Sequence, residues 1–152
     1  MKLQTKPKWV IGIDPDCDRN GIAVYNTMIK ELEEVKALSF IDLMQYIESF
    51  MENIGEDSYL IRLEAGWLCK KSNWHGQTGV VAQRISKNVG ANHEVGRQIE
   101  KYLISKSFNY ELIKPIGYSK LFIDAKVFKS VTKWEGITNG DSRSACAMVW
   151  GY

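Results

Sequence analysis

The stretch that most constrains the fold is residues 9–15, whose sequence WVIGIDP is an apolar run that ends in a carboxylate and a proline. A run this apolar is typical of a central strand buried on both faces, and the proline ends the strand. In open α/β sheets, functional sites lie at the carboxyl ends of such strands. We therefore interpret Asp14 as the first ligand of a metal site.

Size and composition favour an ordinary globular protein. The 152 residues are enough to bury a core, and we expect one domain over residues 1–152. No apolar run reaches the roughly 18–20 residues of a membrane span, and the polar, basic first eight residues do not resemble a signal peptide. The three cysteines form no CxxC pair, so neither a zinc site nor a disulfide framework is indicated. We expect a cytoplasmic protein with reduced thiols.

Charge is distributed unevenly along the chain. Residues 31–64 contain nine acids and two bases, whereas residues 65–133 contain twelve bases and four acids. Such an asymmetry suggests a polyanionic partner such as nucleic acid, although two differently solvated surfaces would account for it equally well.

Apolar patterns predict five strands. We expect them at residues 9–14, 21–25, 33–40, 58–65 and 110–114. The polar turn between the first two strands is short enough for an antiparallel hairpin, and the third strand extends it into a meander. A right-handed crossover would place the fourth strand parallel to the first. The prediction is an α/β fold with a mixed sheet.

Helical periodicity predicts the remaining elements. We expect helices at residues 41–54 and 92–105, a short helix near 124–131, and a last helix from 141 to the end. Asn92 is the predicted N-cap of the second of these helices. The loop predicted at residues 66–79 is too long for a simple connection, which indicates a functional or mobile segment.

Three carboxylates lie at ends of predicted elements that the fold would bring to the same edge of the sheet. Asp14 ends the first strand, Glu64 lies near the end of the fourth, and Asp141 begins the last helix. Acids that converge on one point raise each other's pKa, and a divalent cation resolves the conflict. Oxygen ligands favour Mg²⁺ or Mn²⁺. Two such ions about 3.5–4 Å apart would activate a water and stabilise the leaving oxygen of a phosphodiester.

Each acid also has a plainer interpretation. Asp14 could begin an Asp-Pro turn, and Glu64 could pair with Arg62 on the same strand face. Asp141 could be the N-cap of its helix. The order of the three acids along the chain is what favours a shared site.

Three segments of the chain are similar to those of a known family. They are the stretch IGIDP at residues 11–15, the strand ending in Leu63-Glu64 and the helix beginning DSRSA at residue 141. In order and spacing they resemble the RuvC-type Holliday junction resolvases of the ribonuclease H-like superfamily. The resemblance implies a five-stranded mixed sheet, with three antiparallel strands, parallel fourth and fifth strands, and helices on both faces. It also implies a homodimeric, metal-dependent endonuclease acting on four-way DNA junctions. Asp14, Glu64 and Asp141 would be its catalytic and metal-binding carboxylates.

Two positions depart from this family. Asp16 stands where the family usually has glycine, and Ser144 stands where the last helix usually bears a second metal-binding acid. Three explanations remain open: Asp16 or Asp18 compensates, the second metal binds weakly, or the chain is inactive. The alternatives to a junction endonuclease are therefore a catalytically weak protein that binds branched DNA, and a related nuclease acting on RNA or RNA–DNA hybrid.

Two basic segments are candidates for contacts with the phosphate backbone and with unpaired bases. The predicted nucleic-acid-binding residues are Lys70, Lys71, Trp74, His75, Arg84, Lys87, Lys126, Lys129 and Lys133. Ordinary surface lysines and core aromatic residues are the alternative interpretation. The two histidines, His75 and His93, are not at metal-ligand spacing, although His75 lies in the basic loop and could touch phosphate.

Overall fold

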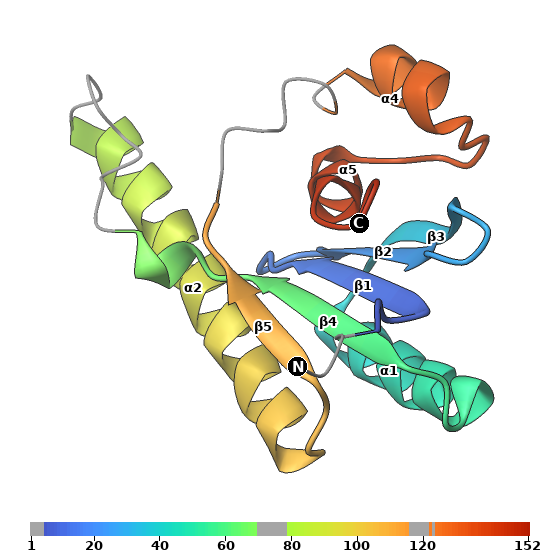
Figure 1. Cartoon of the computed structure of the whole chain (residues 1–152). Helices are drawn as coiled ribbons and strands as arrows, with labels where there is room; N and C mark the ends of the chain where they lie inside the picture. Colours follow the sequence, from blue (N-terminus) through green and yellow to red (C-terminus); the bar gives the residue numbers. More distant parts are fainter. Residues whose placement is uncertain (1–4, 70–78, 116–121, 123) are drawn as a thin grey trace.

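The computed structural model describes residues 5–69, 79–115, 122 and 124–152, and it is built on a five-stranded sheet of order β3-β2-β1-β4-β5 (Figure 1). The antiparallel strands are β1 (Trp9–Asp14), β2 (Asn20–Asn26) and β3 (Glu31–Leu38). β4 (Tyr59–Glu64) pairs in parallel with β1, and β5 (Tyr110–Ile113) pairs in parallel with β4. The predicted mixed sheet is confirmed.

Helices cover both faces of the sheet. α1 (Phe40–Ile54) and α2 (Gly79–Ser105) lie on one face, while α4 (Ala125–Thr132) and α5 (Gly140–Ala147) lie on the other (Figure 1). No helix in the described ranges is long and apolar enough to span a membrane.

The alternation of side chains along β1 explains why both faces are apolar. Ile11 and Ile13 point to the face covered by α1 and α2, where they pack in one buried cluster with Ile47 and Ile99. Val10 points the other way, into the cluster below α4 and α5. The central position of β1, predicted from its continuous apolar run, follows from this burial on both sides.

Two glycines let α5 lie directly on the sheet. A Cβ at Gly12 would be 2.3 Å from the Ala145 carbonyl oxygen, and one at Gly21 would be 2.0 Å from the Asp141 carbonyl oxygen. Any larger residue would therefore push α5 away from β1 and β2. This close approach is what brings the start of α5 to the end of β1.

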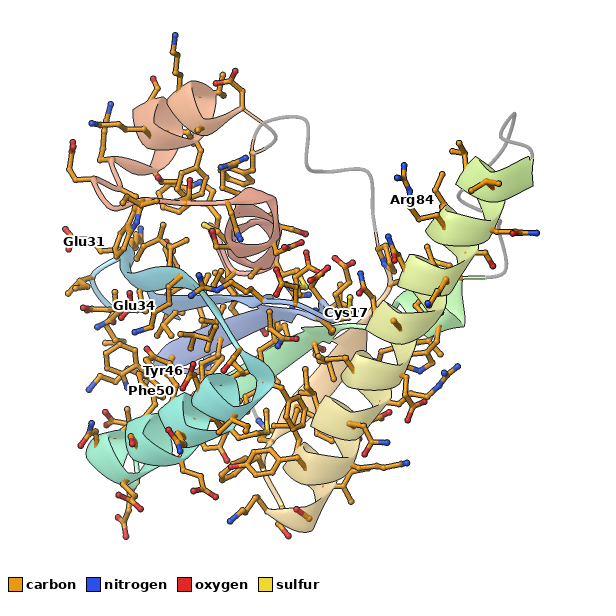
Figure 2. The ribbon with its side chains drawn as sticks, turned by 180° about the vertical axis from the view of Figure 1, so that it is seen from behind. Cys17, Glu31, Glu34, Tyr46, Phe50 and Arg84 are labelled. Carbon is orange, nitrogen blue, oxygen red and sulfur yellow. The ribbon has the colours of Figure 1, made fainter. Side chains whose placement is uncertain are left out.

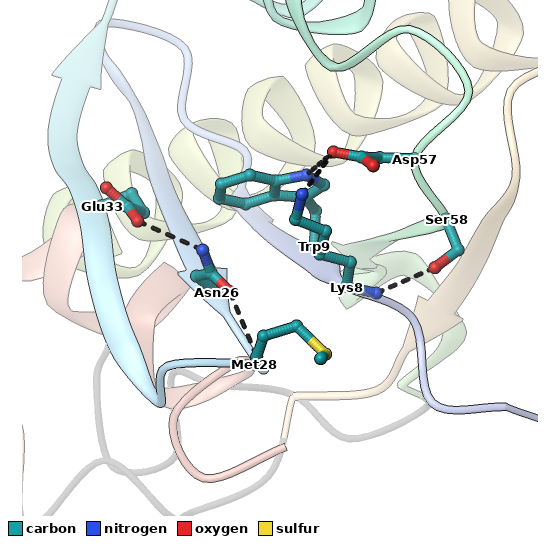
Figure 3. Close-up of polar contacts among 7 residues, drawn as sticks. All are labelled: Lys8, Trp9, Asn26, Met28, Glu33, Asp57 and Ser58. Carbon is teal, nitrogen blue, oxygen red and sulfur yellow. Dashed lines mark hydrogen bonds and ion pairs between the residues drawn. The ribbon is translucent and has the colours of Figure 1, made fainter.

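The opposite end of the sheet is held by polar contacts that join the chain before β1 to the chain before β4 (Figure 3). The Lys8 backbone N–H donates to Ser58 Oγ at 3.0 Å, and Lys8 Nζ pairs with Asp57 at 2.8 Å. The Trp9 indole N–H donates to the same Asp57 carboxylate at 3.1 Å. These contacts fix the amino ends of β1 and β4 side by side.

The helical elements differ from the prediction in three places. α2 begins at Gly79, so Asn92 is an interior residue of the helix and its predicted role as N-cap is wrong. Most residues of α2 before position 92 are exposed, and the half-buried Ala82, Ile85 and Val89 form only a narrow stripe on one face, which is a weak signal for a helix. The predicted loop at 66–79 begins with a 3₁₀ turn, η1 (Gly66–Leu68), and α5 is shorter than predicted.

Candidate active site

A pocket of about 180 Å³ opens at the carboxyl ends of β1 and β4. Asp14, Glu64 and Asp141 all line it, so the three acids predicted to meet do share one pocket. The rest of the wall comes from the loop after β1, from η1, from one face of α2 and from the end of β5. Those residues are Pro15, Gly66, Trp67, Val89, Asn92, His93 and Pro115.

The register of the parallel strands explains why two of these acids are neighbours. Ile13 of β1 is opposite Leu63 of β4, so Asp14 and Glu64 each come one residue later at the same sheet edge. Arg62 donates to Glu111 of β5 at 2.7 Å and to the Met148 carbonyl oxygen. The ion-pair partner of Arg62 in the described part of the chain is therefore Glu111, and the alternative pairing with Glu64 is not formed.

The first turn of α5 brings the third acid. Asn139 is the N-cap: its Oδ1 accepts from the Ser142 N–H at 2.8 Å, and Ser142 Oγ accepts from the Asn139 N–H at 2.9 Å. This reciprocal capping box satisfies the helix terminus without Asp141. The alternative role of Asp141 as the N-cap is thus wrong, and its carboxylate lines the pocket.

Ser144 lies between two of the acids. Its hydroxyl lies 3.5 Å from Glu64 Oε2, to which it can donate, and it is also near enough to Asp14 to lower the pKa of that carboxyl by donating to it instead. The residue that replaces the expected second acid of the last helix therefore does face the site. It contributes a neutral hydroxyl where a carboxylate would add a further negative charge.

The electrostatics of the pocket disfavour ionised acids. Burial, followed by the nearby charge of Glu64, raises the pKa of Asp14 to about 8, against the smaller opposing effect of its Ser144 hydrogen bond. Burial, followed by the charges of Asp16 and Asp18, raises the pKa of Asp141 to about 6. Because ionisation of these carboxyl groups is unfavourable in the empty pocket, a bound cation would stabilise their ionised forms.

The acids of the pocket have the ligand atoms that a divalent metal ion prefers. Carboxylate oxygens in a common pocket suit Mg²⁺ or Mn²⁺. Across the described residues, however, no group of three or more His, Cys, Asp or Glu side chains is close enough to hold one ion. The acids thus line the walls of a shared pocket, without three of them being gathered at metal-binding distance.

The turn after β1 is held by a contact that the sequence did not reveal. Asp16 Oδ1 accepts from the N–H groups of Asp18 and Arg19, and its Oδ2 accepts from the Asn92 side chain at 3.1 Å. Asn92 in turn accepts from the Cys17 N–H at 2.8 Å. Asp16 is therefore a residue of the turn after β1, and Asn92 fixes that turn beside Asp14.

The predicted nucleic-acid contacts fall into separate places. Arg84 and Lys87 are exposed on the part of α2 that projects beyond the sheet, on the helix that lines the pocket (Figures 1 and 2). Exposed lysines also lie on or just after α4, at positions 126, 129 and 133, and that at 129 pairs with Glu135 at 2.7 Å. The predicted contacts Lys70, Lys71, Trp74 and His75 lie outside the described residues.

The sheet order, the parallel β4 and β5, and the helices on both faces define a ribonuclease H-like α/β fold of the RuvC type. The match comes from structure alone, since no protein-family model and no curated protein sequence matches the chain. A solved structure that shares the fold is RuvC from T. thermophilus in complex with Holliday junction substrate. The two chains are 10% identical, with a TM-score of 0.54 over 93% of this chain and 90% of that one.

Proposed function

We propose that this protein is a divalent-metal-dependent endonuclease that cuts branched DNA, with the four-way junction as its substrate. The observation that carries the proposal is that Asp14, Glu64 and Asp141 line one pocket at the carboxyl ends of β1 and β4. In an open α/β sheet this is where functional sites are found. The RuvC-like fold supports a nuclease, and the junction bound in the neighbouring structure supports branched DNA as the substrate class.

Each residue of the pocket would have a separate role in metal binding and cleavage. Asp14, Glu64 and Asp141 would hold Mg²⁺ or Mn²⁺, one or two ions, through carboxylate oxygens. When bound, such an ion supplies an activated water and stabilises charge on the phosphate. Ser144 would orient one of these acids at a time, because its single hydroxyl proton can be donated either to Glu64 or to Asp14. Asn92 keeps the turn after β1 in place, so that the backbone beside Asp14 is rigid.

Basic residues would hold the DNA on either side of this pocket. Arg84 and Lys87 extend from the pocket-lining helix, and we propose that they contact backbone phosphates. Lys126 and Lys129 of α4, with Lys133 just after it, would form a second strip. Lys70, Lys71, Trp74 and His75 would contact DNA near the junction. Two copies of the chain would place two pockets on one junction, and we propose a cytoplasmic homodimer.

Ser144 favours a second candidate, a protein that binds branched DNA but cuts it slowly or not at all. A hydroxyl is a poorer Mg²⁺ ligand than a carboxylate, so a second ion would bind weakly at this side of the pocket. Both candidates share the same DNA surface, and only the rate of cleavage separates them.

The test is a cleavage assay on a labelled four-way junction, a linear duplex and an RNA–DNA hybrid, each with Mg²⁺ or Mn²⁺. We compare the wild type with Asp14→Asn, and with Glu52→Gln as a matched control, because Glu52 is an exposed acid of α1 outside the pocket. The proposal predicts nicks in the junction that persist in the control and fall at least 100-fold in Asp14→Asn.

The other outcomes each select an alternative. Tight junction binding without nicks under either metal would contradict the nuclease and support the binding protein. Cleavage of the hybrid in preference to the junction would contradict the substrate assignment. Nicks that survive in Asp14→Asn would show that the cutting is not done in this pocket.

A further inference from the structure

The wall of the pocket opposite the acids is one face of α2. Val89, Asn92 and His93 lie three and four residues apart, which places them on the same side of the helix, and all three line the pocket. Asn92 is already engaged with the turn after β1. His93 is therefore the remaining polar side chain that this face of α2 brings to the pocket.

His93 sits close to the backbone that follows β4. Its Nε2 lies 2.8 Å from the point that a Cβ would occupy at Gly66, and Gly66 is two residues after Glu64. A side chain at position 66 would collide with the imidazole, so the glycine makes room for it. The ring is thus packed against the end of β4, on the rim of the same pocket as the acids.

The imidazole has unused hydrogen-bonding capacity. Neither ring nitrogen hydrogen-bonds to any residue in the described part of the chain, although His93 is half buried. Burial, followed by the charge of Arg97 one turn along α2, lowers its pKa, which favours the neutral form of the ring. A neutral imidazole carries one N–H donor, which the protein leaves available beside the pocket.

We propose that His93 contacts the substrate in this pocket, its imidazole N–H donating a hydrogen bond to a non-bridging oxygen of the phosphodiester. This inference rests on the proposed function, because it takes the pocket to be the place where the phosphodiester is held. A wall of acids repels a phosphate, so a donor is needed on the facing wall. A hydrogen bond to an ionised acceptor is stronger than one between neutral groups, and a fixed donor costs no reorganisation.

The first test measures single-turnover cleavage of the four-way junction by the full chain at saturating protein. His93→Ala should cut about 10- to 100-fold more slowly, the loss expected for a hydrogen bond to a charged group. His93→Gln, which returns an N–H donor, should recover most of the rate. Gln98→Ala, an exposed change on α2 away from the pocket, is the control. The affinity for the junction should change less than about threefold, since other phosphate contacts dominate binding.

The second readout does not depend on cleavage. The ¹⁵N signals of the imidazole are followed as the junction is added with Ca²⁺ in place of Mg²⁺, and the His93 signals are those absent from the His93→Gln spectrum. The proposal predicts that these signals shift on binding. Circular dichroism melts of both variants confirm that each is folded before either readout is compared.

Two results would overturn the contact, each by itself: His93→Ala cutting within about twofold of the wild type, or His93 signals that stay in place when the junction binds. Failure of the proposed function gives a different pattern. If the wild type cuts no substrate under any metal, the endonuclease is refuted, and the imidazole signals alone then decide whether His93 contacts the phosphate.

Discussion

The carboxyl of Asp14 predicts how the stability of the metal-free protein depends on pH. Its pKa rises from 3.8 to about 8 on folding, so between these values the folded chain binds a proton that the unfolded chain has lost. Stability therefore falls as pH rises through this window and is unaffected by Asp14 below about pH 4. At about 1.36 kcal/mol per pH unit, the upper limit of the penalty at pH 7.5 is about 5 kcal/mol.

Asp14→Asn removes that penalty while keeping the size of the side chain and an acceptor for Ser144. Because Asp14 is partly exposed, solvent screening reduces the effect, and we expect a gain of about 2–3 kcal/mol at pH 7.5. At pH 4.5 the gain should nearly vanish. The assay is urea unfolding in EDTA at both pH values.

A second aspartate provides the control for this prediction. Hydrogen bonds from Lys8 and Trp9 lower the pKa of Asp57, so Asp57→Asn should reduce stability at pH 7.5, opposite in sign to Asp14→Asn.

Mg²⁺ should stabilise the wild type more than Asp14→Asn, because only the wild type keeps the full set of ligands. The reasoning is refuted if Asp14→Asn is no more stable than the wild type at pH 7.5, or if its gain is equally large at pH 4.5.

Three further substitutions test the supports of the site. Gly21→Ala should cost about 1–3 kcal/mol in urea unfolding and slow junction cleavage, because its Cβ would displace the backbone of Asp141; an unchanged rate would contradict this. Ser144→Asp should reduce metal-free stability at pH 7.5 by about 1 kcal/mol or more and raise the cleavage rate in Mg²⁺, which single-turnover kinetics would measure. Arg62→Met should lose about 1–2 kcal/mol through its contact with Glu111 while leaving cleavage unchanged, since Arg62 is not in the pocket wall.

Much of the fold was predictable because it depends on local pattern and chain order. The continuous apolar run of β1 indicated a strand buried on both faces, and the crossover rule placed β4 parallel to it. Those two steps were enough to predict that Asp14 and Glu64 share a sheet edge. Asp141 was predicted from its place at the start of the last helix, although the chain uses Asn139 as the cap.

The facing wall of the pocket was not predictable in the same way. The N-terminal half of α2 carries only a narrow stripe of half-buried residues, at positions 82, 85 and 89, so the sequence predicts a helix that starts at Asn92 instead of Gly79. The sequence therefore predicts Asn92 as an N-cap, whereas in the structure its side chain binds a turn 75 positions earlier in the chain. His93 is not at metal-ligand spacing in the sequence, and it reaches the pocket through the packing of α2 against Gly66.

The most direct measurement of the central claim is an anomalous difference map from a crystal of the wild-type protein soaked in Mn²⁺. The account predicts a Mn²⁺ peak in the pocket within about 2.5 Å of a carboxylate oxygen of Asp14, with Glu64 as a second ligand. A fully soaked crystal that shows Mn²⁺ elsewhere on the protein and none at Asp14 would contradict it.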